Sequence, residues 1–146
     1  MIRHDLSHWP LVLSTMAGAS APDEHQTFFA EWSAWLNRGV PFATLRVFQD
    51  DASLERPSGG AKEAKLWLQE NGDKIRQQVV GMATVVPPSR FDEMSRMNAE
   101  KLFGVPAQTF ATIEPAVAWI VARLEDNGLT ADTAAVGKTL ERLLVE

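Results

Sequence analysis

The residues best suited to chemistry gather in one short loop, which follows an apolar, β-favouring segment at 42–48. The loop carries three carboxylates and a hydroxyl: Asp50, Asp51, Glu55 and Ser58. Acidic side chains that follow a strand can hold Mg²⁺ or serve as a catalytic acid. These acids are not spaced like a metal-binding loop, so we favour a solvated turn. An enzyme built on Asp50, Asp51 and Glu55 is the least favoured of three functional hypotheses.

Ser58 stands directly before Gly59 and Gly60, where a helix is expected to begin. A serine in this position is a good N-cap, worth about 1 kcal/mol, and the glycines let the backbone turn sharply. The same hydroxyl is also a candidate phosphorylation site. The helix dipole and the cations Arg56 and Lys62 would stabilise a phosphate there. The structural cap is the favoured interpretation, and the regulated hydroxyl stays open beside it.

The rest of the chain offers few catalytic groups. Cysteine is absent, which excludes disulfides, zinc–thiolate sites and a cysteine nucleophile. The three histidines, His4, His8 and His25, define no fixed metal geometry. No serine stands in a Gly-x-Ser-x-Gly sequence, and no glycine-rich nucleotide-binding motif occurs. We therefore predict no catalytic residues, no cofactor and no bound metal.

Composition narrows the classes of partner. The 146 residues fit one domain of ordinary size. The net charge of −5, without any basic run, disfavours nucleic acid and anionic membrane surfaces. No apolar run approaches the ~18 residues of a membrane span. The segment 1–21 resembles a secretion signal, but Asp5, His8 and Pro10 interrupt it, so we expect a first strand there and a cytoplasmic protein.

Strand and helix signals alternate along the chain. β-Favouring segments predict strands at 10–16, 42–48, 79–86 and 107–112, and helical periodicity predicts helices at 22–37, 60–70, 89–104, 112–127 and 130–146. This order predicts an α/β fold: a two-layer or sandwich arrangement with a largely parallel four-stranded sheet flanked by helices. Gly81, inside the third strand, predicts a β-bulge or a close backbone approach.

Tryptophan is abundant, and three of the five tryptophans, Trp32, Trp35 and Trp67, occupy the apolar stripes of the first two helices. Core packing is the plain interpretation of such stripes. The alternative is an aromatic-lined pocket for a small, lipid-like molecule, or an exposed docking patch for a protein.

The C-terminal segment 130–146 predicts an amphipathic helix whose apolar stripe consists of Val136, Leu140, Leu143 and Leu144. A short helix is marginal alone, so this stripe must be buried. It could dock on its own domain or on a second subunit. We expect residues 129–146 to form a separate docking element, and we favour a homodimer through residues 130–146.

Several features resemble the STAS domain, the fold of anti-sigma-factor antagonists. They are the order of elements, the tryptophan-rich first helix, the strand in RGVPFATLRVF (38–48) and the helix in FATIEPAVAWIVARL (110–124). The chain looks closer still to the divergent SpoIIAA-like proteins described as STAS/SEC14. The resemblance covers most of residues 5–126, and it implies a STAS-like domain at 1–128.

The resemblance also implies a function. Signalling members of that family are bacterial regulatory proteins, not enzymes, and they present a phosphorylatable Ser or Thr in an Asp-Ser-Ser-Gly loop. Ser58-Gly59 is the nearest match, although Glu55-Arg56-Pro57 replaces the acid and first hydroxyl, and Gly60 replaces an apolar residue. The implied activity is docking of a protein partner by the 50–60 loop and the helix that follows it. The docking residues would be Asp50, Asp51, Arg56, Ser58, Gly59, Gly60 and Lys62. The SEC14 side of the resemblance favours instead a carrier of a small apolar ligand.

Overall fold

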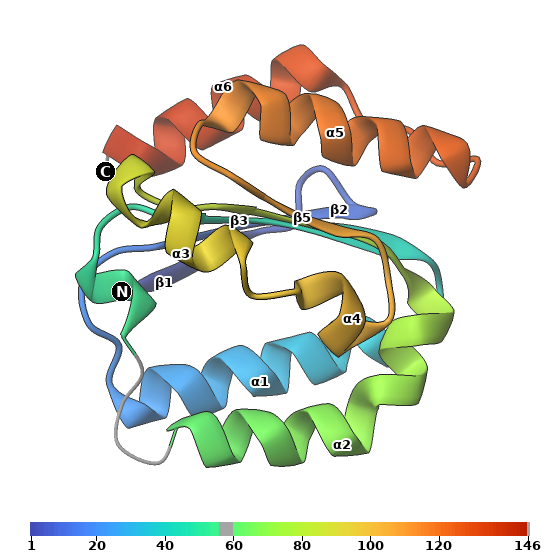
Figure 1. Cartoon of the computed structure of the whole chain (residues 1–146). Coiled ribbons are helices and arrows are strands. Elements are labelled where there is room, and N and C mark those ends of the chain that lie inside the picture. Colours follow the sequence, from blue (N-terminus) through green and yellow to red (C-terminus); the bar gives the residue numbers. More distant parts are fainter. Residues whose placement is uncertain (56–59, 146) are drawn as a thin grey trace.

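A β-sheet forms the middle layer of the molecule, and helices cover both of its faces (Figure 1). This architecture comes from a computed structural model that describes residues 1–55 and 60–145. The strands are β1 (Ile2–Asp5), β2 (Leu11–Met16), β3 (Phe42–Phe48), β4 (Val79–Val85) and β5 (Ala107–Phe110). The predicted α/β class is therefore confirmed.

The sheet is five-stranded and mixed, so the expectation of four strands was wrong. Its spatial order is β1-β2-β3-β4-β5, and β2 to β5 are parallel. The additional strand, β1, pairs antiparallel with β2 at the edge, with His4 opposite Ser14. It escaped prediction because Arg3, His4 and Asp5 lack the β-branched and aromatic character of typical strands.

The helices form two layers, one on each face of the sheet. The helices are α1 (Pro22–Leu36), α2 (Gly60–Gln78), α3 (Phe91–Ser95), α4 (Ala99–Phe103), α5 (Ile113–Asp126) and α6 (Thr133–Val145), with 3-10 turns η1 (Ala52–Leu54) and η2 (Pro88–Arg90). The connections from β2 to β5 always step the same way along the sheet, and crossovers between parallel strands are right-handed. Consequently the helices between these strands, α1 to α4, lie on one face. The helices that follow the last strand, α5 and α6, cover the other face (Figure 1).

Two predicted helix boundaries were wrong. The helix expected at 60–70 continues past Asn71-Gly72 to Gln78, because Ile75 is fully buried and extends the apolar face into the core. The single helix expected at 89–104 is broken into η2, α3 and α4. Met97, between α3 and α4, is 60% exposed, so burial does not hold this stretch in one continuous helix.

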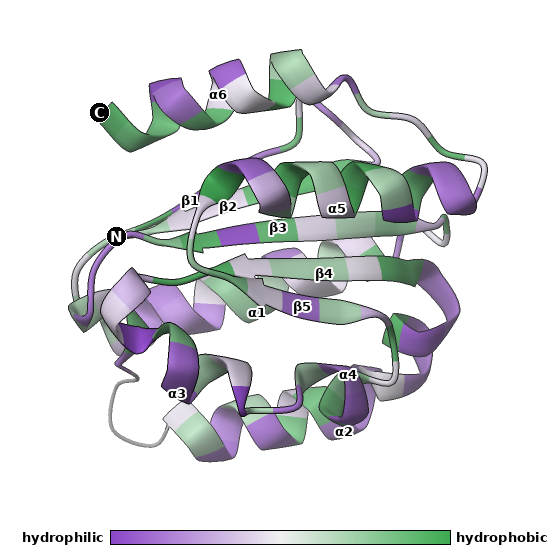
Figure 2. Cartoon of the chain, turned by 45° about the horizontal axis from the view of Figure 1, so that its top comes forward, coloured by the Kyte–Doolittle hydropathy of each residue, from purple (hydrophilic) through white to green (hydrophobic). Residues whose placement is uncertain are grey.

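Each face of the sheet has its own apolar core, because side chains alternate along a strand. Leu13, Leu45 and Ala83 face α5 and α6. Val12 and Phe42 face α1 and α2, where they join a cluster of aromatic residues. Figure 2 shows the strands as largely hydrophobic and the helices as alternating between hydrophobic and hydrophilic turns. None of the helices within the described ranges is long and apolar enough to cross a membrane.

The helix α6 docks on the sheet of its own chain. Val136 and Leu140 are buried in the core that α5 and α6 share, and the His8 Nε2 atom lies 2.7 Å from Thr139 Oγ1. Arg142 lies 3.6 Å from Asp5, whose strand borders this layer. The apolar stripe of 130–146 is thus largely buried within the monomer. The homodimer remains a prediction, and an unburied stripe no longer argues for it.

Gly81 combines both features that its position predicted. The register of β3 and β4 shifts beside it, where Phe42 pairs with Val79 and Ala43 with Gly81. A Cβ atom on Gly81 would lie 3.1 Å from Arg123 and Ile120 of α5. The glycine therefore allows α5 to approach the sheet closely.

We expect Gly81→Val to lower the free energy of unfolding by about 1–3 kcal/mol, because the larger side chain overpacks this contact. Urea denaturation measures the change. The matched control is Gly137→Val in α6, where a Cβ atom would meet nothing within 4 Å. Equal free energies of unfolding for both variants would contradict the close approach of α5.

Candidate ligand-binding cavity

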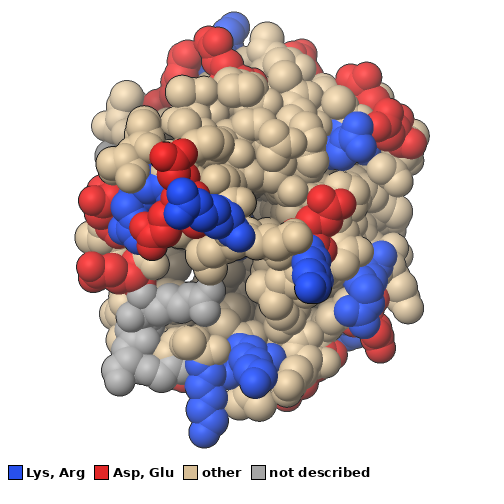
Figure 3. All heavy atoms as spheres, in the orientation of Figure 1, with Lys and Arg blue, Asp and Glu red and all other residues tan. Residues whose placement is uncertain are grey.

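A cavity of about 330 Å³ lies between the sheet and the layer formed by α1 to α4. Its walls are mostly apolar side chains from both layers. Figure 3 shows the same face of the molecule as Figure 1, hollowed between the segment that carries α3 and the layer of α1 and α2. Met94 of the short helix α3 and Phe103 of the short helix α4 also line the cavity.

Aromatic rings of α1 and α2 form one wall of the cavity. Phe29 stacks on Trp67 with ring centroids 5.3 Å apart, and Trp32 meets Trp67 edge-on at 5.7 Å. The Trp67 indole N–H donates to Ser33 Oγ at 3.0 Å, which fixes the orientation of that ring. Of the three tryptophans singled out in the sequence, Trp32 and Trp67 line the cavity. Trp35 lies outside the lining, 4% exposed and packed against Trp32.

The opposite wall is the sheet, and it places one arginine in the cavity. Arg46 lies on the central strand β3, is half-buried, and lines the cavity beside Phe48. Its Nη2 atom donates to Thr84 Oγ1 on β4 at 3.1 Å. The strand registers pair Arg46 with both Thr84 and Ser14. With His4 on β1, a polar row therefore crosses the sheet at the level of Arg46.

His4 anchors the outer end of this row. Its Nδ1 atom lies 2.7 Å from Ser14 Oγ, its Nε2 atom lies 3.2 Å from Glu31 Oε2, and its ring packs between Phe28 and Trp35. Serine, histidine and glutamate are the groups of a hydrolytic triad. Here, however, Ser14 is 2% exposed and is not part of the cavity lining. The arrangement therefore holds β1 against α1.

Burial lowers the pKa of His4 below its ordinary value of 6.5, and the carboxylate of Glu31 partly opposes this effect. The folded state thus binds the proton less readily than the unfolded chain does. The contribution of His4 to the free energy of unfolding is complete above pH 6.5, and it decreases as the pH falls from there towards the lowered pKa.

We expect the free energy of unfolding of the wild type to fall between about pH 7 and about pH 5, and His4→Gln to flatten that slope. Urea denaturation across this pH range measures the free energy of unfolding and its slope against pH. Glu31→Gln is the informative partner variant. It removes the charge that raises the pKa of His4, so its slope should be steeper than that of the wild type. A His4→Gln slope equal to that of the wild type would show that His4 does not cause the pH dependence.

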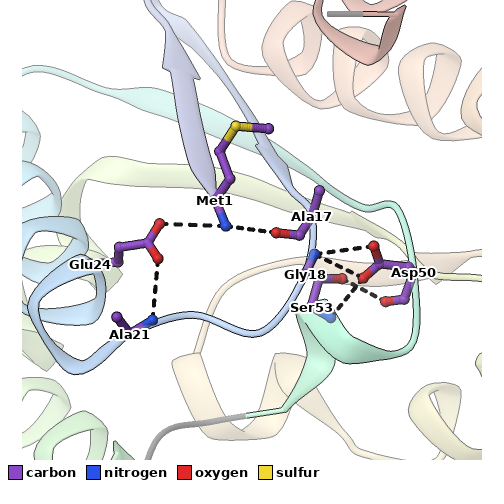
Figure 4. A network of polar contacts seen from close by, with 7 residues as sticks. All are labelled: Met1, Ala17, Gly18, Ala21, Glu24, Asp50 and Ser53. Atoms are coloured by element: carbon purple, nitrogen blue, oxygen red, sulfur yellow. Dashed lines mark hydrogen bonds and ion pairs between the residues drawn. The ribbon is translucent and has the colours of Figure 1, made fainter.

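Asp50, which the sequence placed in a partner-binding loop, makes hydrogen bonds within its own chain. Its carboxylate accepts hydrogen bonds from the backbone N–H groups of Gly18, at 3.1 Å, and of Ser53, at 2.8 Å (Figure 4). The Ser53 hydroxyl donates to the Asp50 carbonyl oxygen at 2.6 Å. The backbone bonds from Ser53 and Gly18 hold the pKa of Asp50 below its usual range. Asp50 therefore fastens the end of β3 to the connection between β2 and α1.

Asp50→Asn should lower the urea midpoint at neutral pH, because an amide oxygen accepts these N–H bonds more weakly than a carboxylate does. The difference from the wild type should shrink as the pH falls through the lowered pKa of Asp50. Asp51→Asn is the matched control, since the exposed Asp51 side chain should leave the midpoint unchanged. Equal midpoints for both variants would contradict the fastening role.

The remaining predicted site residues are scattered. Asp51 and Lys62 are exposed, Glu55 lies in the cavity lining, and Gly60 is buried at the start of α2. Among the described residues, no cluster of acids or histidines could hold a metal ion. Arg56, Ser58 and Gly59 lie outside the described residues. The phosphorylation site and the docking role of the loop therefore stay predictions.

The sequence analysis did not select Arg46 or the phenylalanines of the cavity. A signal for Arg46 was present in the strand FATLRVF. Strand alternation places Phe42, Thr44, Arg46 and Phe48 on the same face of the sheet. A charged side chain among such residues, in a central strand covered on both faces, marks an unusual site.

Comparisons of the chain with protein-family models, with curated proteins and with solved structures found no match. The resemblance to STAS domains thus remains a prediction, and the functional argument depends on the cavity itself.

Proposed function

We propose that the protein binds a small apolar ligand in the cavity between the sheet and α1 to α4, and acts as a carrier of that ligand. The observation that supports this is the cavity of about 330 Å³ with aromatic walls. Protein interiors are otherwise packed as closely as organic crystals, with few voids larger than a water molecule. Ligand pockets typically begin at about 300 Å³ and are lined mainly by apolar and aromatic side chains.

The volume limits the size of the ligand. A water molecule occupies about 30 Å³ of the liquid, so the cavity accommodates on the order of ten non-hydrogen atoms. A medium-length alkyl chain or a small ring compound is of this size.

Binding is proposed in preference to catalysis, because Ser14 and His4 are held away from the cavity lining. It is also proposed in preference to protein docking by the 50–60 loop, because the bonds that Asp50 makes are internal. An aromatic-lined pocket is what the carrier hypothesis requires, whereas docking of a protein by the 50–60 loop does not require one.

The test is a fluorescence titration with decanol, an uncharged ten-carbon alcohol. Trp32 and Trp67 line the cavity, so occupancy should change tryptophan emission in a saturable way, with one ligand per chain. Hexanol is the matched control. It lacks four methylene groups worth about 0.8 kcal/mol each, so it should bind about 200-fold more weakly. Absence of any saturable change up to the solubility limit of decanol would contradict the proposal.

A further inference from the structure

We infer that the natural ligand of this cavity is a planar aromatic compound of about two fused rings, which lies against the aromatic side chains of α1 and α2. This inference rests on the proposed function and specifies the chemical class of the ligand. The volume alone leaves the class open, because an alkyl chain and a ring compound of about ten non-hydrogen atoms both fit. The side chains that line the cavity distinguish between the two.

Aromatic side chains reach the cavity from four elements of the fold. Within the described part of the chain, six lining residues carry a phenyl or indole ring: Phe28, Phe29, Trp32, Phe48, Trp67 and Phe103. They lie on α1, α2, α4 and the strand β3, so both layers contribute rings to the lining. An alkyl chain needs only an apolar surface, which leucine or isoleucine supplies equally well. The abundance of rings therefore favours a ligand that gains free energy from rings in particular.

The rings of α1 and α2 form a wall in which both stacked and edge-on orientations occur. Phe29 stacks on Trp67 at an interplanar angle of 27°. Phe28 meets Phe29 edge-on at 75°, and Trp32 meets Trp67 edge-on at 72°. An aromatic ring is negative on its face and positive at its edge, so a bound ring can align with rings in either orientation. A saturated chain has no such charge distribution. The bond from the Trp67 indole N–H to Ser33 Oγ keeps the wall in this arrangement.

Methionine side chains line the cavity beside the rings. Met16 is on β2, Met82 is on β4 and Met94 is on α3. A thioether sulfur makes favourable contacts with aromatic rings at a distance of about 5 Å, and the unbranched side chain adapts to the outline of its neighbour. Met16 and Met82 belong to the sheet, which faces the wall of α1 and α2 (Figure 1). A flat ring between the two layers would therefore have aromatic rings on one side and methionine sulfur atoms on the other.

The experiment compares 2-naphthol with decahydro-2-naphthol by calorimetric titration of the wild type. The two compounds have the same carbon skeleton and the same hydroxyl group, and only 2-naphthol is aromatic. The saturated compound carries more hydrogen atoms, so burial of apolar area alone would favour it. We expect the opposite order, with 2-naphthol binding about tenfold more tightly, because contacts between aromatic rings are worth more than the area they bury.

Phe29→Leu tests whether the aromatic wall causes this preference, because leucine keeps an apolar side chain without the ring. This variant should bind 2-naphthol at least about threefold more weakly than the wild type does, and decahydro-2-naphthol as before. Phe110→Leu is the matched control. Phe110 is on β5, in the core on the side of α5, and does not belong to the described lining. This control should bind both compounds with the affinities of the wild type.

The methyl resonances of the methionines report where the ring is bound. An aromatic ring shifts the resonances of methyl groups close to it, so 2-naphthol should shift those of Met16 and Met82 more than decahydro-2-naphthol does. Met97 is the internal control, since it is 60% exposed and outside the described lining. Shifts confined to Met97 would overturn the placement of the ring in the cavity.

The outcomes separate this inference from the proposed function. If decanol binds the wild type and 2-naphthol binds no more tightly than decahydro-2-naphthol, the aromatic assignment is overturned and the apolar cavity stands. Equal affinities of the wild type and Phe29→Leu for 2-naphthol overturn the role of the aromatic wall. If none of the three compounds binds the wild type, both proposals fail. The wild-type comparison and the methionine resonances decide the question if Phe29→Leu does not fold.

Discussion

Trp32→Ala is expected to lower the free energy of unfolding by about 3–5 kcal/mol, which is a large share of the stability of a domain this size. Trp32 is 3% exposed and lies where three aromatic contacts meet. Its ring centroid is 5.6 Å from that of Trp35, 5.7 Å from that of Trp67 and 6.1 Å from that of Phe42. Truncation removes all three contacts and joins the vacated volume to the existing cavity.

Urea denaturation followed by circular dichroism measures this effect without depending on tryptophan emission. Trp119→Ala is the matched control on the other face of the sheet. Trp119 is half-buried, and its aromatic contact is with Phe110 at 6.0 Å. We expect its loss to be less than half that of Trp32→Ala. A loss below about 1 kcal/mol for Trp32→Ala would show that the α1–sheet contact is looser than described.

Filling the cavity should abolish ligand binding while the fold persists. Ala64 lies on α2, is half-buried and lines the cavity, so a phenylalanine there would occupy space that the ligand needs. We expect Ala64→Phe to weaken decanol binding at least about 100-fold, equivalent to roughly 2.8 kcal/mol. The free energy of unfolding should stay close to that of the wild type, because the new ring enters a void.

Ala118→Phe is the matched control for this substitution. Ala118 is an exposed residue of α5, in the helical layer on the other face of the sheet. It should bind decanol with the affinity of the wild type. Unchanged binding by Ala64→Phe would place the ligand outside this cavity, and weaker binding by both variants would indicate a general effect on folding.

The layered fold could be predicted because its signals are local. The apolar and β-branched residues of FATLRVF appear as a strand, β3, with the same bounds as predicted. Errors occurred where tertiary contacts overrule local signals. The turn signal at Asn71-Gly72 lies inside α2, because burying Ile75 stabilises two more helical turns. The edge strand β1 contains polar residues, and its backbone pairs with β2 even so.

The cavity could be predicted only in part. The helical stripe identified Trp32, Trp35 and Trp67 together, yet only packing against the sheet decides which rings face a void. Residues that share a helical face within one turn still differ in depth, so periodicity alone could not exclude Trp35. Arg46 joins the site through strands and helices that are distant in sequence, and a local pattern does not report such neighbours.

The contacts of Asp50, in the predicted partner loop, also depend on residues that are distant in sequence. The resemblance to STAS domains put Asp50 among the docking residues, and that role stays a prediction. In the structure its oxygens accept the N–H groups of Gly18 and Ser53. The Gly18 contact spans 32 residues, so the structural role of this carboxylate became visible only once the two loops were placed together.

The most direct test of the cavity is the measurement of nuclear Overhauser contacts between bound decanol and the isotope-labelled protein. We predict contacts from the alkyl chain of decanol to the rings of Phe29 and Trp67 and to the methyl groups of Leu68, all of which line the cavity. Contacts confined to side chains of α5 and α6, or none when decanol is at saturating concentration, would contradict the assignment of this cavity as the binding site.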